Sequence, residues 1–202
     1  AADSKTVFYT TEDDAKRSAH LYRHTLGSDV KGDALVYDET DERFEVSIHD
    51  SLDGRLLLLN LDSQTTSEVR WLDARKPAGT FATVLPRKQG VQYSVMPRGQ
   101  TLVMLTNDGC RTDQLVEVPL AKPQSSPRVV MGCDAVRPIE TAQVFDSFTA
   151  VVVRENGLPV IQVLKKNAEK QPLRVVPDDA DYSLGLGVNA EFKTDSLVYW
   201  AS

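Results

Sequence analysis

The feature that most constrains the fold is a repeat of about 45 residues. An apolar–Ser–apolar motif begins at Val46, Tyr93 and Tyr182, so successive copies lie 47 and 89 residues apart, the second interval being close to twice the first. Short strands and polar turns in units of this length are typical of β-propeller blades. Because one blade cannot bury both of its faces, we expect a row of mutually dependent units. The three copies and the expected position of a fourth each precede a second apolar run, at residues 56–61, 102–105, 148–153 and 197–200.

Three complete four-stranded antiparallel blades are predicted from apolar segments separated by turn residues. Asp53-Gly54 and Asn156-Gly157 are hairpin signals, and Pro97-Arg98-Gly99-Gln100 predicts a further turn. The predicted strands are 45–48, 55–61, 68–73 and 81–85 in one blade, 92–96, 101–106, 114–118 and 128–131 in the next, and 140–144, 148–154, 159–164 and 173–176 in the third.

The predicted blades at the two ends are incomplete. Segments 6–10, 19–23 and 34–37 supply three strands of a leading blade that lacks its innermost strand, and 182–186 and 197–200 supply the first two strands of a trailing blade. The sequence therefore predicts an all-β protein, a partial β-propeller. It would form a single domain over residues 1–202, cut from a larger propeller. Because open sheets leave unpaired edges, we expect the isolated chain to self-associate or to be only marginally stable as a monomer.

Composition and charge argue against two classes of partner. The chain is 41% hydrophobic and 26% charged, as folded proteins are. Its net charge of -6 disfavours nucleic-acid binding, since no stripe of Lys and Arg is available to neutralise phosphates. No apolar run approaches the roughly 18 residues of a membrane span. We therefore predict neither a nucleic-acid partner nor a membrane partner.

Cys110 and Cys133 are the only cysteines, 23 residues apart, one in a predicted loop and one at a strand end. They could form one bridge, but a single pair is far from a disulfide scaffold. We interpret them as free thiols in a reducing compartment. The absence of an Asn-x-Ser/Thr acceptor and of a leader-like segment fits the same interpretation. The expected localisation is cytoplasmic.

Motifs that would carry catalysis or bind a cofactor are weak in this chain. No Gly-x-Ser-x-Gly elbow occurs. His49 precedes Asp50-Ser51, but adjacent residues of a strand point to opposite faces, which is poor geometry for a triad. Residues 185–190 fit a relaxed dinucleotide fingerprint without the helix that must follow it. The acidic runs 12–14 and 38–42 lack the spacing of a calcium loop. We predict no catalytic residue, no cofactor and no metal site.

Several segments carry a family resemblance. The most specific are Thr65-Thr66-Ser67-Glu68-Val69 and Arg154-Glu155-Asn156-Gly157-Leu158, which occur in combination with residues 41–46 and 51–59. Together the matches span nearly the whole chain, which resembles the propeller of the prolyl oligopeptidase family and is most similar to the oligopeptidase B branch. The other matching segments, in order, are 7–11, 21–24, 105–109 and 182–187.

This resemblance implies a two-domain serine endopeptidase, in which a seven-bladed propeller caps an α/β-hydrolase domain and restricts substrates to short peptides. Enzymes similar to oligopeptidase B cleave after Arg or Lys, whereas prolyl oligopeptidases cleave after Pro. By the same resemblance, the nucleophile, aspartate and histidine lie in the hydrolase domain, outside this chain. The implied partners are that domain and a short peptide.

One loop is the best candidate for a functional contact. Residues 62–68 join the second and third strands of a blade, and such loops cluster on one rim of a propeller; by resemblance, a rim faces the hydrolase domain and the substrate cavity. The equivalent loops are 107–113 and Asn156-Gly157. The alternative is that these polar residues simply make turns. The candidate residues for substrate or inter-domain contact are Asp62, Gln64, Thr65, Thr66, Glu68 and Arg70.

Three functions compete at this point. The chain is the gating propeller segment of an oligopeptidase B-like peptidase, a stand-alone propeller scaffold for peptides or proteins, or a sugar- or nucleotide-acting propeller enzyme. The Gly-His and Trp-Asp pairs of common scaffold repeats are absent, which disfavours the second. The third would need convergent carboxylates on inner strands, where Glu45 and Glu140 are nearly the only ones. The first is therefore favoured.

Overall fold

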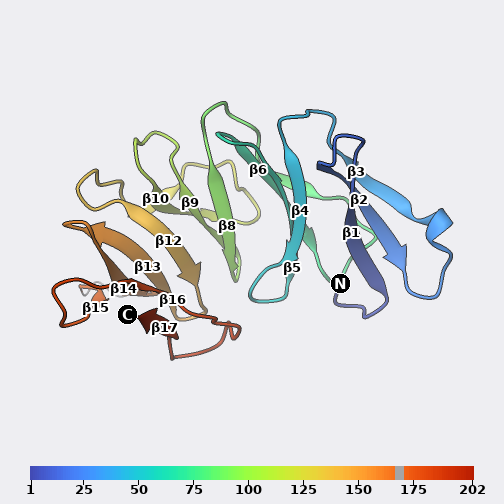
Figure 1. Ribbon diagram of the computed structural model, residues 1–202. Coiled ribbons are helices and arrows are strands. Elements are labelled where there is room, and N and C mark those ends of the chain that lie inside the picture. Colours follow the sequence, from blue (N-terminus) through green and yellow to red (C-terminus); the bar gives the residue numbers. More distant parts are fainter. Residues whose placement is uncertain (167–170) are drawn as a thin grey trace. The chain divides into compact units, whose positions relative to one another are not determined.

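A computed structural model describes residues 1–166 and 171–202 (Figure 1). This part of the chain is almost entirely strands and turns, and its one helical element is the short 3-10 helix η1 (Val30–Gly32). No helix in the described residues is long and apolar enough to cross a membrane. The strands are β1 (Thr6–Glu12), β2 (Ser18–Thr25), β3 (Ala34–Asp38), β4 (Glu45–Asp50), β5 (Leu56–Asp62), β6 (Ser67–Asp73), β7 (Ala82–Leu85), β8 (Tyr93–Arg98), β9 (Thr101–Thr106), β10 (Gln114–Pro119), β11 (Arg128–Met131), β12 (Ile139–Val144), β13 (Phe148–Glu155), β14 (Leu158–Lys165), β15 (Leu173–Val175), β16 (Leu184–Leu186) and β17 (Tyr199–Ala201).

The strands form separate antiparallel sheets in which neighbours along the chain are neighbours in space. The sheet orders are β1-β2-β3, β4-β5-β6-β7, β8 to β11, β12 to β15, and β16-β17. Each four-stranded sheet is an up-and-down meander, the arrangement of a propeller blade. The chain divides into two compact units, Ala1–Tyr93 and Ser94–Ser202.

The first unit packs the sheet β1–β3 against the sheet β4–β7. Strand β5 is buried at nearly every position, which explains its run of consecutive leucines: both faces of the strand are covered. Strand β4 instead alternates, with Val46 buried and its neighbours in the strand more exposed. The shared core consists of Leu21, Phe44, Val46, Leu57, Leu59, Leu61, Leu72, Ala74 and Phe81.

The second unit repeats this arrangement with the sheets β8–β11 and β12–β15. Strand β13 is its most buried strand, with Phe148 through Val153 all inside. The two-residue hairpin between β13 and β14 turns at Asn156 and Gly157, both at positive φ (51° and 87°). That geometry favours an Asn-Gly pair. The core consists of Val103, Leu115, Ile139, Val144, Val151, Val153 and Val160.

The predicted architecture is confirmed, with small shifts at the strand ends. The three predicted four-stranded sheets are present, and the leading sheet has three strands. The turn predicted at residues 97–100 is wrong in its first half, because β8 continues through Pro97 and Arg98 and turns only at Gly99. Pro97 is tolerated there because β8 is an edge strand, where a missing N–H removes no essential ladder bond.

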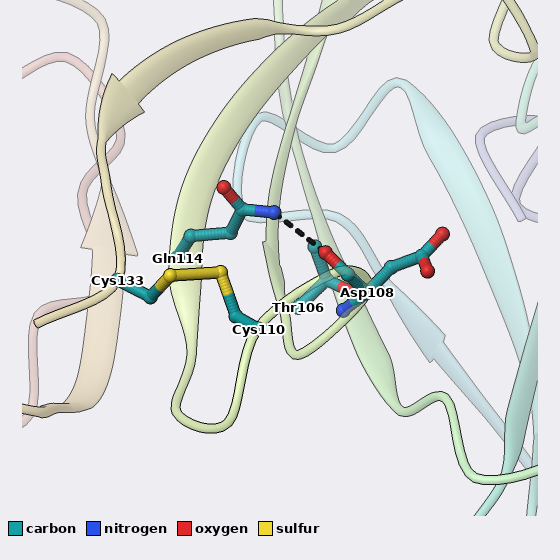
Figure 2. Close-up of a disulfide and its surroundings, with 5 residues drawn as sticks. All are labelled: Thr106, Asp108, Cys110, Gln114 and Cys133. Atoms are coloured by element: carbon teal, nitrogen blue, oxygen red, sulfur yellow. Dashed lines mark hydrogen bonds between the residues drawn. A yellow bond between two sulfur atoms is a disulfide. The ribbon is translucent and has the colours of Figure 1, made fainter. Parts of the chain in front are cut away.

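The interpretation of the cysteines as free thiols is wrong. Cys110 and Cys133 form a disulfide with their Cα atoms 6.1 Å apart (Figure 2). Strands β10 and β11 are antiparallel with Leu115 opposite Met131. The end of β11 therefore lies beside the start of β10, which brings the two cysteines together. Sequence separation alone did not reveal this proximity.

Candidate functional site

A pocket of about 720 Å³ lies at one end of the sheet β4–β7, in the first unit. It opens where β4 begins and β5 ends, beside the β5–β6 connection. Four of the six candidate residues line it: Asp62, Gln64, Thr65 and Thr66. The rest of the lining is Glu42, Arg43, Phe44, Glu45, Ser63 and Gln89.

The β5–β6 connection is a tight, internally bonded turn. The Ser63 backbone N–H and hydroxyl both donate to the Thr66 carbonyl, each at 2.9 Å, and the Ser63 hydroxyl accepts from the Thr66 N–H at 3.0 Å. Thr66 is buried, and its hydroxyl accepts a hydrogen bond from the Gly90 N–H at 3.1 Å. Gln64 and Thr65 are consequently left exposed at the tip, where they can contact another molecule.

The pocket lining carries uncompensated negative charge. Arg43, its one cation, already pairs with Asp41, which holds the pKa of Asp41 at about 2. Glu45 and Asp62 are direct cross-strand partners on β4 and β5, an arrangement in which like charges repel. Within the described residues, neither of them nor Glu42 has a Lys or Arg at ion-pair distance. A positively charged group placed in the pocket would relieve this repulsion.

The carboxyl group of Asp62, at the end of β5, has a raised pKa. Burial by surrounding atoms raises its pKa, and the His49 ring acts in the opposite direction. Burial also lowers the pKa of His49, while Asp50 and Asp62 raise it. A cation bound beside Asp62 would favour its charged form.

Glu68 and Arg70, the other two candidates, lie in an ion network next to this pocket. The Arg70 Nε donates to a Glu68 carboxylate oxygen at 2.6 Å, and the other oxygen lies 3.3 Å from Arg87 Nε. That second contact lacks hydrogen-bond geometry, because Arg87 Nε is buried without an acceptor in line. Glu68 is only 6% exposed. Both candidates therefore make internal contacts, and contact with another domain remains a prediction.

Arg87 links the two sheets of the first unit. Its guanidinium lies 3.7 Å above the Phe44 ring, pairs with Glu39, and donates to the Tyr37 hydroxyl at 3.3 Å. Burial raises the pKa of Tyr37 to about 12, and the Glu39 carboxylate adds to this. Burial alone would raise the pKa of Glu39, but Arg87, the Asp41 N–H and the Tyr37 hydroxyl lower it further than burial raises it. Glu39 is consequently a buried anion held by its partners.

The sequence did not single out Arg87 or the pocket residues Phe44 and Gln89. Arg87 follows β7 and Phe44 precedes β4, so both lie just outside the predicted strands. Their joint position depends on how blades pack, which periodicity does not give. A usable signal was present in Pro86-Arg87, a cation two residues after the end of an edge strand.

The histidines make ordinary polar contacts. His24 Nδ1 lies 2.7 Å from Asp33, which also accepts from the Tyr9 hydroxyl, and His20 Nδ1 lies 2.9 Å from Asp38. The Ser51 hydroxyl is buried and donates to Asp53 at 2.6 Å, so it is not presented to the neighbouring histidine.

The glycines of the dinucleotide-like segment have a packing role. A Cβ on Gly185 would lie 2.6 Å from the Trp200 ring, and one on Gly187 would lie 2.9 Å from Val198. Residues 187–198 contain no helix that could face a phosphate. The glycines therefore allow β17 and the residue just before it, Val198, to pack closely against β16. The interpretation of this segment as a nucleotide-binding motif gains no support.

Comparison with known proteins shows the protein family to which the chain belongs. The family model for the prolyl oligopeptidase N-terminal β-propeller domain matches residues 1–202, and the chain belongs to that family.

Particular relatives lie in its peptidase branches. The chain is 35% identical over 158 residues to protease 2 of Moraxella lacunata, covering 78% of this chain and 23% of the relative. It is 31% identical over 202 residues to dipeptidyl aminopeptidase BI of Pseudoxanthomonas mexicana, covering 98% of this chain and 27% of the relative. Among solved structures, closed oligopeptidase B from Trypanosoma brucei with covalently bound antipain superposes with a TM-score of 0.91 at 27% identity. That match covers 98% of this chain and 30% of the other. The chain thus spans about a quarter of the length of these curated relatives.

Proposed function

We propose that this chain is a segment of the substrate-gating propeller of an oligopeptidase B-like serine endopeptidase that cleaves short peptides, after Arg or Lys. The observation that carries the proposal is the superposition on closed oligopeptidase B at a TM-score of 0.91 over 98% of the chain. The catalytic residues would belong to an α/β-hydrolase domain outside these residues. In this role the chain shapes access to the active site and performs no bond cleavage itself.

The rim pocket supports a role in contacting peptide or hydrolase domain. Its carboxylates Glu45 and Asp62 oppose each other, and no Lys or Arg among the described residues lies at ion-pair distance from either. An Arg or Lys side chain, or a peptide ammonium, would supply the missing charge. The exposed Gln64 and Thr65 offer hydrogen-bond donors and acceptors beside it. We assign the exposed Asp62, Gln64 and Thr65 to direct contact, and the buried Thr66 together with Glu68 and Arg70 to support of the rim.

The specificity can be tested on the full-length gene product with fluorogenic peptides that have blocked N-termini. Peptides with Arg or Lys before the scissile bond should be cleaved at least about tenfold faster than a Pro peptide. A tenfold preference corresponds to roughly 1.4 kcal/mol of differential transition-state binding. A Pro preference would move the protein to the prolyl oligopeptidase branch. Equal cleavage of a short peptide and of the same sequence within a folded protein would contradict gating.

A dipeptidyl aminopeptidase activity is a second candidate, favoured by the 31% identity over 98% of the chain. It is distinguished by the N-terminus of the substrate. An enzyme of that kind should cleave an unblocked dipeptide reporter and fail on its blocked counterpart, whereas the endopeptidase should cleave the blocked peptide. If the gene product carries no peptidase activity on either, the stand-alone scaffold becomes the leading hypothesis.

The pocket assignment is tested by removing charge without changing shape. In the full-length protein, Asp62→Asn should raise KM for peptides carrying an additional cation by about three- to tenfold, while kcat changes little. The expected factor is that of one partly exposed charge pair, roughly 1 kcal/mol. Glu12→Gln is the matched control, because Glu12 lies in the same unit on β1, outside the pocket. Equal kinetics for both variants would remove Asp62 from the contact surface.

A further inference from the structure

The disulfide closes the β9–β10 connection at one end of the sheet β8–β11. Cys110 lies within that connection, in a turn where its N–H donates to the Asn107 carbonyl at 3.0 Å. Cys133 lies two residues beyond β11. As Figure 2 shows, the bond joins the loop to the chain that follows β11, and Gln114 Nε2 donates to the Asp108 carbonyl at 2.7 Å. The position of the cross-link is thus set by the register of β9, β10 and β11.

Other roles for the two sulfurs have little support. No group of three or more His, Cys, Asp or Glu side chains that could hold a metal occurs in the described part of the chain. Figure 2 draws Thr106, Asp108 and Gln114 beside the bond, and Gln114 Nε2 donates to the loop carbonyl of Asp108 rather than to either sulfur. The arrangement is that of a structural cross-link.

The bond is also accessible to its surroundings. Cys133 is exposed and Cys110 is half-buried, so soluble thiols and thiol–disulfide oxidoreductases can reach the sulfurs. An accessible disulfide in a cytosol kept reducing by glutathione and thioredoxin is generally opened, whereas it persists in secreted or periplasmic proteins. Its oxidation state therefore reports the compartment in which the protein resides.

We propose that the Cys110–Cys133 disulfide is a permanent structural bond and that the protein functions in an oxidising compartment outside the cytoplasm. The bond forms by exchange with a disulfide donor. The two thiols lose two electrons and two protons and become one S–S bond, while the donor disulfide is reduced to two thiols. This proposal runs against the cytoplasmic localisation expected from the sequence, and it does not depend on the peptidase activity.

The test maps the bond in the native protein. Source cells are quenched in acid, free thiols are alkylated, and the full-length protein is digested with trypsin without reduction. The expected product is peptide 99–111 linked to peptide 129–154, since trypsin cuts after Arg98, Arg111, Arg128 and Arg154 and not at Arg137-Pro138. We expect the linked species to exceed the alkylated peptides about tenfold. Recovery of both peptides mainly in alkylated form would overturn the proposal.

Fractionation provides the second measurement. The linked species should be found in the periplasmic or secreted fraction and be absent from the cytosolic one. A linked species confined to the cytosol, or one that appears only after oxidant stress, would replace the permanent bond with a reversible switch and would refute the proposal. A variant carrying both Cys110→Ser and Cys133→Ser should give neither linked nor alkylated forms of these peptides, which identifies the signals. Because mapping needs no enzymatic assay, loss of the proposed peptidase function would leave this test intact.

Discussion

The β5–β6 and β9–β10 connections occupy the same position in two successive four-stranded sheets but are held in different ways. Residues 63–66 form a short turn that closes on itself through the Ser63 and Thr66 side chains, and an ion network lies directly behind it. Residues 107–113 form a longer loop that is fastened to the end of β11 by a disulfide. The first connection lies in the unit Ala1–Tyr93 and the second in the unit Ser94–Ser202.

The difference shows that length decides which interaction can fix a rim loop. A four-residue turn has few conformations to lose, so two or three hydrogen bonds of about 1 kcal/mol each suffice. A longer loop loses more conformational entropy on ordering, and a covalent bond removes part of that cost from the unfolded state. The short turn therefore keeps its polar tip available for contacts, whereas the longer loop depends on a cross-link.

Replacing Arg87 should produce the largest difference in hydrogen exchange between the 63–66 turn and loop 107–113. In Arg87→Met, the Glu39 carboxylate stays buried at 4% exposure without its cation. Breaking a buried pair on one side costs about 3 kcal/mol or more. In the full-length protein, we expect hydrogen exchange to speed up about a hundredfold in β3, β6 and the 63–66 turn. The amides of loop 107–113 should be unchanged.

Arg75→Met is the control for that experiment. Arg75 pairs with Asp73 in the same sheet, but its side chain is 77% exposed, and such pairs contribute little. Comparable acceleration in both variants would mean that loss of any arginine loosens this unit. No acceleration in Arg87→Met would show that the network orients the blades without stabilising them.

Opening the disulfide should have the next largest effect, confined to the other connection. With both cysteines replaced by serine, the loop between positions separated by 23 residues is no longer closed, and the loss is about 3 kcal/mol in the chain-entropy model. Exchange in loop 107–113 and β11 should accelerate, with the 63–66 turn unaffected. Reducing the wild-type protein should reproduce the result. Acceleration in the variant but not after reduction would assign the effect to the substituted side chains.

The fold was largely predictable because each blade of a propeller repeats the same pattern of apolar strands and polar turns in the sequence. Apolar runs such as residues 56–61 and 148–153 are buried on both faces, and the Asn156-Gly157 hairpin was fixed by turn chemistry. Pro97 was misjudged because a proline suits an edge strand as well as a turn, and sequence does not mark edges.

The site was only half predictable, since it depends on packing between strands that are distant in sequence. The loop carrying Asp62 and Gln64 could be recognised by its position between strands. Glu68 pairs with Arg70 two residues on, and it also contacts Arg87, 19 residues further on, which the pairing of β6 with β7 brings beside it. The disulfide could have been found from the predicted strands 114–118 and 128–131, because antiparallel pairing of those strands places Cys133 near the loop that contains Cys110. The cysteine count alone instead favoured free thiols.

A smaller effect is expected from the turn itself. Ser63→Ala removes one side-chain donor to the Thr66 carbonyl and one acceptor for its N–H. The expected loss is about 1 kcal/mol, or roughly fivefold faster exchange at residues 63–66. Ser125→Ala is a suitable control, because Ser125 is exposed in another loop. If the two substitutions are indistinguishable, the backbone bond from the Ser63 N–H to the Thr66 carbonyl is sufficient to close the turn.

The smallest expected effect is a difference in how the two connections respond to acid. The pKa of Glu39 is lowered from its ordinary 4.5 by Arg87, Tyr37 and the Asp41 N–H against the opposing effect of burial. Its contribution is therefore complete above about pH 4.5 and is lost as the pH falls through the folded-state pKa. Burial raises the pKa of Asp113 in the β9–β10 loop. Its ionisation therefore opposes folding, and acid relieves that penalty.

Lowering the pH from about 5.5 to about 3.5 should consequently loosen the ion network behind the 63–66 turn and leave the disulfide-closed loop as protected as before, or slightly more. The measurement is hydrogen exchange of both segments in the same full-length sample, corrected for the intrinsic pH dependence of exchange. Glu39→Gln should remove most of the acid response of the first segment. A parallel response of the two segments, unaltered by that substitution, would mean that acid acts on the whole protein, and the contrast between ionic and covalent closure would not explain their difference.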